Sequence, residues 1–294
     1  MKKITLLISA FAMSSMLMYG QTVRKAMPIK NTHSIHEKIR TDIISQVSRT
    51  PDGLVRCFTV ENEKIRKATG LKNESDEQFE SWISQKIVEQ SNNSTTLKAS
   101  RNIPVVVHVI HNGDAVGSGE NISDAQVNSQ ITALNLDFSA TNTDFGNTPS
   151  AFQSVAANPD IQFCLATIDP NGQPTTGIDR VNYGVASFGQ AATESMKAAT
   201  SWDPTKYFNI WVVRFGGDLN GVLGYAQFPS TSGLTGLPSN GGAANTDGIA
   251  IGYNYFGTTG AVSSPYNKGR TVTHETGHWS YKCISIGHLW QYLI

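Results

Sequence analysis

The chain changes its pattern of hydrophobic positions about a third of the way along its length. The run IPVVVHVI at 103–110 has few polar positions, which is typical of a strand buried on both faces. Shorter runs predict strands at 161–168 (IQFCLATI), 208–213 (FNIWVV) and 248–253 (GIAIGY), and LGYAQFP at 223–229 predicts a short extended piece. These runs indicate a sheet-containing domain in the second part of the chain.

Helical periodicity separates these strands. Ser123 precedes Asp124, and Gln126 stands at the third position, a pattern that caps the amino end of a helix. The apolar residues that follow recur at helical spacing and predict an inward face made of Val127, Ile131, Leu134 and Phe138. A second, shorter helix is expected at 191–200. Helices therefore fall between the first and second strands and between the second and third.

The part of the chain before this domain has a different composition. Residues 21–100 are charged and end in the polar stretch SNNSTTLKAS, which indicates a linker. The dense β-branched run begins directly afterwards. We therefore expect an accessory segment and linker at 21–100 and a compact domain at 101–294.

Residues 1–20 have the organisation of a signal peptide. Lys2 and Lys3 form a basic start, an apolar stretch follows, and Gly20 offers a small residue for cleavage. The apolar stretch is short for crossing ~30 Å of lipid, and polar chain follows it at once. We therefore expect export from a bacterial cytoplasm and a secreted protein without a membrane anchor once the signal is removed.

Composition and charge narrow the classes of function. The 23 Lys and Arg residues balance 23 Asp and Glu residues over 294 positions, so the chain lacks the positive charge typical of nucleic-acid binding. Three cysteines, far apart in sequence, do not form a disulfide framework. Cys164, within a predicted strand, is expected to be a small buried hydrophobic residue. Composition does not determine the oligomeric state.

The strongest chemical signal is the motif HETGH at 274–278. Two histidines four positions apart lie on one face of a helix, about 5.4 Å apart along its axis, so His274 and His278 can bind the same Zn²⁺. Glu275 then lies beside the metal, where it can take a proton from the attacking water. The alternative is a solvent-exposed helix, but Val272 and Trp279 give this helix an apolar side.

Several segments together resemble the pappalysin family of metzincin proteases, in its cytophagalysin and ulilysin-like branch. The resemblance covers 101–279 and is carried by RNIPVVVHVIHNG, ENISDAQVNSQITALNLDF, IQFCLATIDPNGQPTTGIDR, YFNIWVV, LGYAQFP and GRTVTHETGHW. It implies an α/β, metzincin-like fold with a five-stranded twisted mixed sheet, a backing helix and an active-site helix. LGYAQFP would be the antiparallel edge strand, available to an extended peptide substrate by β-addition.

The end of the chain departs from this family. Metzincins extend their motif to HExxHxxGxxH, but Tyr281 stands at the glycine position and Ile284 at the third histidine. His288 is the next histidine, and we assign it as the candidate third ligand. The carboxy-terminal subdomain of the family is missing, so we expect a truncated or frameshifted gene product. Family members bind Ca²⁺ mainly through that half, so calcium is allowed without assigned ligands.

Other cysteine and histidine positions have two interpretations each. The resemblance implies that Cys57, in the pro-segment, is a latency ligand that occupies the open zinc position; the alternative is an inert or paired thiol. His108 and His111 are interpreted as core or sheet-edge histidines with hydrogen-bonded nitrogens rather than as metal ligands.

The sequence therefore favours the precursor of a secreted zinc endopeptidase that acts on protein or peptide substrates. One alternative is a catalytically impaired remnant that binds peptide at its edge strand without cleaving it. A carbohydrate-binding module would explain the Gly, Asn and Ser loops, but it leaves the HExxH motif unexplained.

Overall fold

The structure is a computed structural model that describes the main part of the chain. The described residues are 35–70, 101–153, 156, 158–227 and 243–280, together with 81, 84, 85 and 88. The expected signal at 1–20 and the linker at 91–100 lie outside them.

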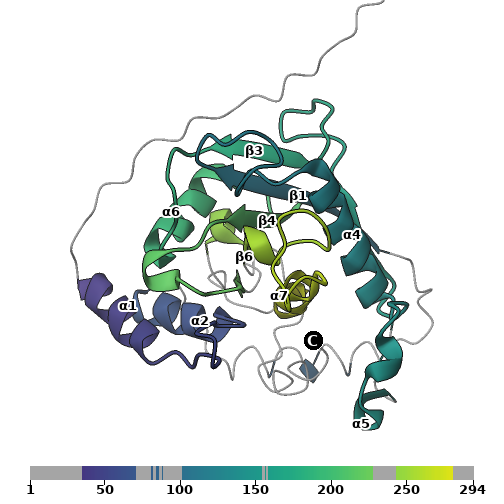
Figure 1. Ribbon diagram of the computed structural model, residues 1–294, viewed down its shortest axis with the longest axis horizontal. Coiled ribbons are helices and arrows are strands. Elements are labelled where there is room, and N and C mark those ends of the chain that lie inside the picture. The colour runs from purple at the N-terminus through teal and green to yellow at the C-terminus, as the bar shows by residue number, and fades with distance from the viewer. Residues whose placement is uncertain are drawn as a thin grey trace, which may run out of the picture.

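A six-stranded mixed sheet forms the centre of the molecule (Figure 1). Its strands are β1 (Arg101–His111), β2 (Ile161–Leu165), β3 (Ile178–Asn182), β4 (Phe208–Val213), β5 (Gly224–Gln227) and β6 (Gly248–Gly252). The order is β2-β1-β4-β6-β5, and β3 also pairs with β1. All pairs are parallel except β5 with β6, so LGYAQFP supplies the antiparallel edge strand as predicted.

The predicted α/β class is confirmed, but the sheet has six strands rather than five. The additional strand is β3, in the segment IDRVN, which is too short and too polar to give a hydrophobic run. β1 is long enough to hold two partners on one side: β2 pairs with 101–105 and β3 with 107–111. The predicted strand at 161–168 therefore ends early, at Leu165, and the chain returns to the sheet as β3.

Helices cover both faces of the sheet. α4 (Asp124–Phe138) and α7 (Arg270–Ser280) contact each other on one face, and α6 (Gln190–Thr200) covers the other (Figure 1). α1 (Ile35–Ser45) and α2 (Thr59–Ala68) lie beyond the β5 edge. Shorter helical turns are α5 (Ser150–Gln153), Phe145–Asn147, Gly217–Leu219, Ala244–Thr246 and Tyr253–Tyr255.

The burial of side chains in the core confirms the hydrophobic patterns that predicted the strands and α4. Residues 105–111 of β1 are all buried, because alternate side chains enter the hydrophobic layers on the two faces. Ser123 caps α4, since its Oγ accepts a hydrogen bond from the Gln126 backbone N at 3.2 Å. The inward face of α4 buries Val127 and Leu134 completely.

One core prediction is wrong. Cys164 is exposed, because β2 lies at a sheet edge and its alternation turns Phe163 into the core and Cys164 outward. His108 is the buried core histidine that was expected: its Nδ1 lies 3.0 Å from Asp179 Oδ2 and its Nε2 lies 2.9 Å from Asn209 Oδ1. Both ring nitrogens therefore have partners within the core, as expected for a histidine that is not a metal ligand.

An ionic contact attaches the start of α7 to the end of α4. Arg270 pairs with Asp137 at 2.6 Å and also with Asp144, and Thr273 Oγ1 donates to Asp137 Oδ2 at 2.6 Å. Gly269 precedes α7 with φ +74°, and a Cβ there would lie 2.9 Å from that of Ala133. Glycine permits both the turn and the close packing of the two helices.

The contact at Asp144 predicts an acid-sensitive contribution to stability. Asn142, Lys268 and Arg270 lower the pKa of Asp144 from 3.8 to about 2, so the folded state favours the carboxylate. This contribution is present above pH 4 and is lost as the pH falls towards 2. We expect Asp144→Asn to lower the free energy of unfolding by about 1 kcal/mol at pH 7, allowing for solvent screening. Urea unfolding from pH 7 to pH 2 checks this, and a constant difference at all pH values would contradict it.

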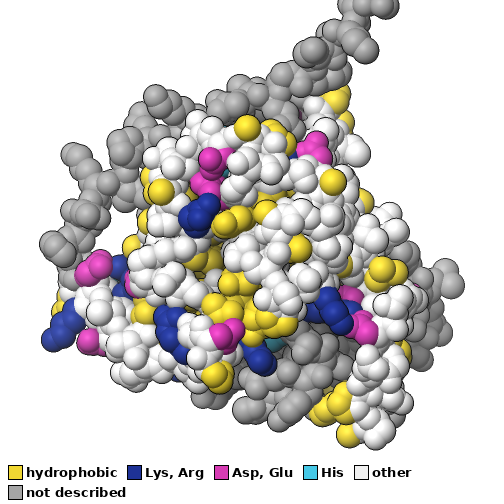
Figure 2. Space-filling view, in the orientation of Figure 1, with side chains coloured by type: hydrophobic (Ala, Val, Ile, Leu, Met, Phe, Trp, Pro, Cys, Tyr) yellow, Lys and Arg dark blue, Asp and Glu magenta, His cyan; other side chains and the backbone are white. Residues whose placement is uncertain are grey.

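The surface of the described residues carries charges of both signs. Lys and Arg are interspersed with Asp and Glu over the face shown in Figure 2, without a field of one sign. Among the helices that the structure describes, none is both long and apolar enough to cross a membrane.

Candidate metal centre

Helix α7 carries the HETGH motif under the edge of the sheet. The Nε2 atoms of His274 and His278 lie 3.1 Å apart, as expected for residues one turn apart on one face. Glu275 is completely buried. Trp279 stacks on Phe208 with ring centroids 4.0 Å apart, so α7 packs against the body of the protein and is not a solvent-exposed helix.

The N-terminal segment brings Cys57 to the same place. Its Sγ lies 3.5 Å from His278 Nε2 and 3.6 Å from Glu275 Oε2. The potential ligand atoms of Cys57, His274, Glu275 and His278 all lie within 4.8 Å of one another. These four residues form the cluster that we call the metal centre.

The spacing of these atoms allows a direct test of whether a metal ion fits. Tetrahedral zinc bonds of about 2.0–2.1 Å to nitrogen and 2.3 Å to sulfur separate two nitrogens by about 3.3 Å, and nitrogen from sulfur by about 3.6 Å. The observed separations are 3.1 Å between the histidine Nε2 atoms and 3.5 Å between His278 Nε2 and Cys57 Sγ. The residues present therefore fit a tetrahedral metal site.

Burial sets the protonation of the metal centre. Desolvation lowers the pKa of His274 to about 3 and that of His278 to about 4, so both imidazoles are neutral at pH 7 and can act as ligands. Desolvation also raises the pKa of Glu275 to about 8 and that of Cys57 well above 9.0. Among the described residues, His274 Nδ1 and Glu275 Oε1 are buried without a hydrogen-bond partner. A cation at the Nε2 atoms of the two histidines would compensate the buried Glu275 carboxylate.

Residues 55–58 lie along residues 221–224, which lead into β5 and end at its first residue; we call this side of the sheet the β5 edge. Val55 N donates to Gly221 O at 2.9 Å, and Val55 O accepts from Leu223 N at 2.9 Å. Phe58 N donates to Gly224 O at 3.1 Å. The edge strand that was predicted to receive a peptide is therefore paired with the chain's own N-terminal segment.

Thr59 is a contact of the metal centre that the sequence analysis missed. Its Oγ1 donates to Glu275 Oε2 at 2.7 Å and accepts from Ala226 N at 2.9 Å. A threonine two positions after a cysteine has no sequence signal for such a role, because the contact spans 216 positions of the chain. His288, the candidate third ligand, lies outside the described residues.

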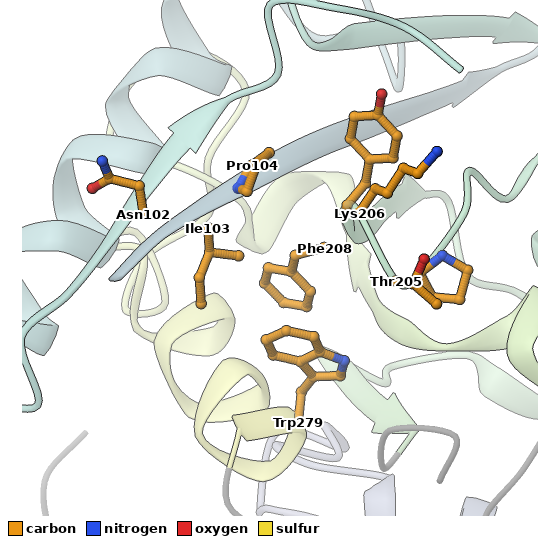
Figure 3. Close-up of a pocket in the computed structure, with 9 residues that line it drawn as sticks. Asn102, Ile103, Pro104, Thr205, Lys206, Phe208 and Trp279 are labelled. Carbon is orange, nitrogen blue, oxygen red and sulfur yellow. The ribbon is translucent and has the colours of Figure 1, made fainter. Parts of the chain in front are cut away.

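A small pocket is lined in part by Trp279 (Figure 3). Its volume is about 200 Å³, and Ile103, Pro104 and Phe208 supply much of its apolar lining. It contains none of the four residues of the metal centre. We therefore treat it as separate from the metal site.

A mixed sheet with an antiparallel edge strand, above a helix that carries HExxH, defines a metalloprotease-like centre. Solved structures agree: mature mirolysin of Tannerella forsythia in complex with a cleaved peptide is 44% identical, with a TM-score of 0.51, over 62% of this chain and 63% of that one. A mutant of T. forsythia promirolysin is 38% identical, with a TM-score of 0.53, over 76% of this chain and 67% of that one. The chain therefore belongs to the metzincin-like metalloproteases of pappalysin type.

Curated relatives point to the same class. The extracellular metalloprotease of Podospora anserina is 30% identical over 178 residues, which are 60% of this chain and 47% of that protein. That of Colletotrichum graminicola is 28% identical over 204 residues, 67% of this chain and 58% of that protein. The chain thus spans about half the length of these curated relatives. No family model matches the sequence.

Proposed function

We propose that the chain is the precursor of a secreted zinc endopeptidase. The observation that carries the proposal is the metal centre, in which two histidine nitrogens and one sulfur have the spacing of zinc ligands beside a buried glutamate. The relatives named extracellular metalloproteases support the class of reaction and the compartment.

Each residue of the metal centre has a separate role in this proposal. His274 and His278 hold the metal, and His288 is proposed as the third protein ligand. Zinc, when bound, lowers the pKa of water towards ~7 and polarises the scissile carbonyl. Glu275 accepts a proton from the attacking water and then donates it to the leaving amine.

The N-terminal segment is proposed to be a pro-segment, which follows a signal peptide at 1–20. Two observations support this: Cys57 lies against the metal centre, and residues 55–58 occupy the β5 edge. The match to promirolysin also covers more of this chain than the match to mature mirolysin does. A peptide substrate would replace this segment on β5.

The edge pairing also favours a second candidate function. A domain that binds extended peptide at β5 without cleaving it would use the same backbone groups, Gly221 O and Leu223 N. The two functions differ in hydrolysis. Zinc content of the purified protein, measured together with hydrolysis of casein after removal of residues 21–100, tests the proposal. Zinc without hydrolysis would favour the peptide-binding alternative, and absence of both would reject the zinc endopeptidase.

The assignment of Cys57 predicts a sulfur ligand in the precursor. We expect X-ray absorption of the zinc-loaded full chain to show one sulfur near 2.3 Å, because Cys57 Sγ already lies at ligand spacing from His278. Cys57→Ala should remove this sulfur shell and increase hydrolysis, since the thiolate no longer excludes water. Cys164→Ala is the matched control, because Cys164 is exposed on β2. A precursor spectrum without sulfur would contradict the assignment.

Calcium stays unassigned in this proposal. Among the described residues, the metal centre is the one group of His, Cys, Asp and Glu side chains with metal-binding spacing. Zinc is the metal that we propose for this group, and calcium keeps no assigned ligands.

A further inference from the structure

Helix α2 is attached to the protein by contacts that do not involve Cys57. The Phe58 ring meets the Tyr225 ring edge to face, with centroids 5.9 Å apart. Asn62 is fully buried, and its Oδ1 accepts from Gln190 Nε2 on α6 at 2.9 Å. Arg66, two turns from the start of the helix, is 1% exposed. These contacts spread over β5 and α6, beyond the metal centre.

Thr59, at the start of α2, joins this helix to the catalytic helix and to the edge strand. One hydroxyl satisfies two buried groups: Glu275 Oε2, to which it donates, and Ala226 N, from which it accepts. Thr59 itself is 0% exposed. Removal of the hydroxyl would leave both groups buried without this partner, which is costlier than loss of an exposed hydrogen bond.

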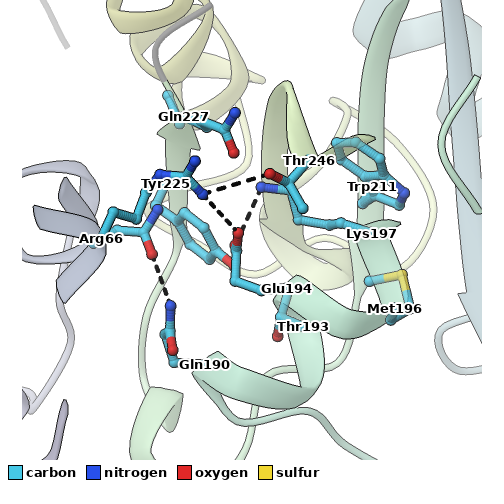
Figure 4. Close-up of polar contacts among 12 residues, drawn as sticks. Arg66, Gln190, Thr193, Glu194, Met196, Lys197, Trp211, Tyr225, Gln227 and Thr246 are labelled. Carbon is cyan, nitrogen blue, oxygen red and sulfur yellow. Dashed lines mark hydrogen bonds and ion pairs between the residues drawn. The ribbon is translucent and has the colours of Figure 1, made fainter. Parts of the chain in front are cut away.

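Arg66 makes the second polar attachment (Figure 4). Its Nη1 lies 3.3 Å from Glu194 Oε2 and 3.4 Å from Thr246 Oγ1. Glu194 Oε1 also accepts from Tyr225 Oη at 2.8 Å and from Lys197 Nζ at 3.2 Å. Glu194 thus has a cationic partner on its own helix in addition to the one that α2 supplies.

This arrangement makes the attachment of α2 reversible. If Arg66 leaves, Glu194 keeps Lys197 as its counter-ion, so departure of α2 does not strand a buried charge. Among the described residues, Nε and Nη2 of Arg66 have no hydrogen-bond partner. Arg66 Nε also lies 3.9 Å from Glu63 Oε1 on the same helix, so this ion pair leaves together with α2.

We propose that Thr59, Asn62 and Arg66 form a second inhibitory attachment, the α2 anchor, which holds the N-terminal segment on the protein without the Cys57 thiol. The anchor occupies Glu275 through Thr59 and the edge amide of Ala226 through the same hydroxyl. Its meaning as a latency device rests on the proposed function. The attachment itself does not depend on that function, so it can be tested without metal and without hydrolysis.

The test uses the full chain in the presence of a chelator. Alkylation of Cys57 by iodoacetamide, followed by mass spectrometry of the tryptic peptide 57–64, measures how often the segment detaches. Hydrogen exchange of the α2 amides measures detachment independently. We expect Thr59→Val to raise the Cys57 alkylation rate at least about tenfold, since two buried groups lose their partner. Thr59→Ser, which keeps the hydroxyl, should stay within about twofold of the unaltered chain.

Two further variants separate the anchor from a general loss of structure. Thr69→Val is the matched control, because within the described part of the chain Thr69 Oγ1 bonds Ile65 O and Arg66 O of its own helix segment. It should leave both readouts unchanged. Arg66→Met keeps the apolar stem and removes the charge, and it should also raise alkylation. Exchange in β1 and β4 confirms that each variant is folded.

Cys57→Ala decides between the anchor and the thiol. We expect α2 to keep its protection from exchange in this variant, because Thr59 and Arg66 remain. Loss of protection as large as in Thr59→Val would show that the thiol holds the segment and would overturn the proposal. Unchanged alkylation in both Thr59→Val and Arg66→Met would overturn it as well. Failure of the proposed protease activity would alter none of these outcomes.

Discussion

Glu275→Gln is expected to lower hydrolysis by ~10²–10⁴-fold and to leave the zinc content unchanged. The histidines hold the metal in the proposed function, whereas the carboxylate of Glu275 moves the proton. Glutamine keeps the size of the side chain but cannot take up the proton. The measurement is kcat/KM on a casein-derived peptide after removal of residues 21–100, together with metal analysis of the same sample.

The control for this prediction lies on the same helix. Ser280→Ala alters a residue whose Oγ donates to Thr276 O of the same helix among the residues that the structure describes, so hydrolysis should be retained. Unchanged turnover in Glu275→Gln would remove Glu275 from the proposed mechanism. Loss of zinc in that variant would instead show that the carboxylate supports the metal centre itself.

Removal of a metal ligand should have the second large effect. We expect His278→Ala to weaken zinc binding to the full chain by at least about 100-fold, because loss of a direct ligand exceeds the 10–100-fold that loss of a supporting partner typically costs. His278 lies within ligand spacing of both His274 and Cys57, so its loss opens the site on two sides. Competition with a zinc-chelating dye measures the change.

His111→Gln is the matched control for this experiment. His111 is a buried histidine whose Nδ1 accepts from Gly113 N at 3.1 Å, and it is not a member of the metal centre. It should keep the affinity of the unaltered chain. His288→Ala, measured in parallel, tests the proposed third ligand: a loss similar to that of His278→Ala supports it, and unchanged affinity rejects it.

The features that the sequence predicted correctly are the local ones. The buried strand at 103–110, the cap at Ser123 and the helix with HETGH depend on residues a few positions apart, so periodicity and spacing were sufficient to predict them. The errors concern sheet edges. β3 and the outward side chain of Cys164 depend on which strands lie beside β1, and periodicity does not contain that order.

The sequence by itself determined the class of protein and predicted the three residues at the centre of the proposed site, because HExxH places two candidate ligands and a candidate base on one helix. Only the tertiary structure decided which other residues contact these three. Cys57 reaches Glu275 across 218 positions, and Thr59 reaches it across 216, because residues 55–58 pair with residues 221–224 and α2 packs on β5. Contacts of this length are set by strand order and helix packing, which hydrophobic periodicity and motif spacing do not encode.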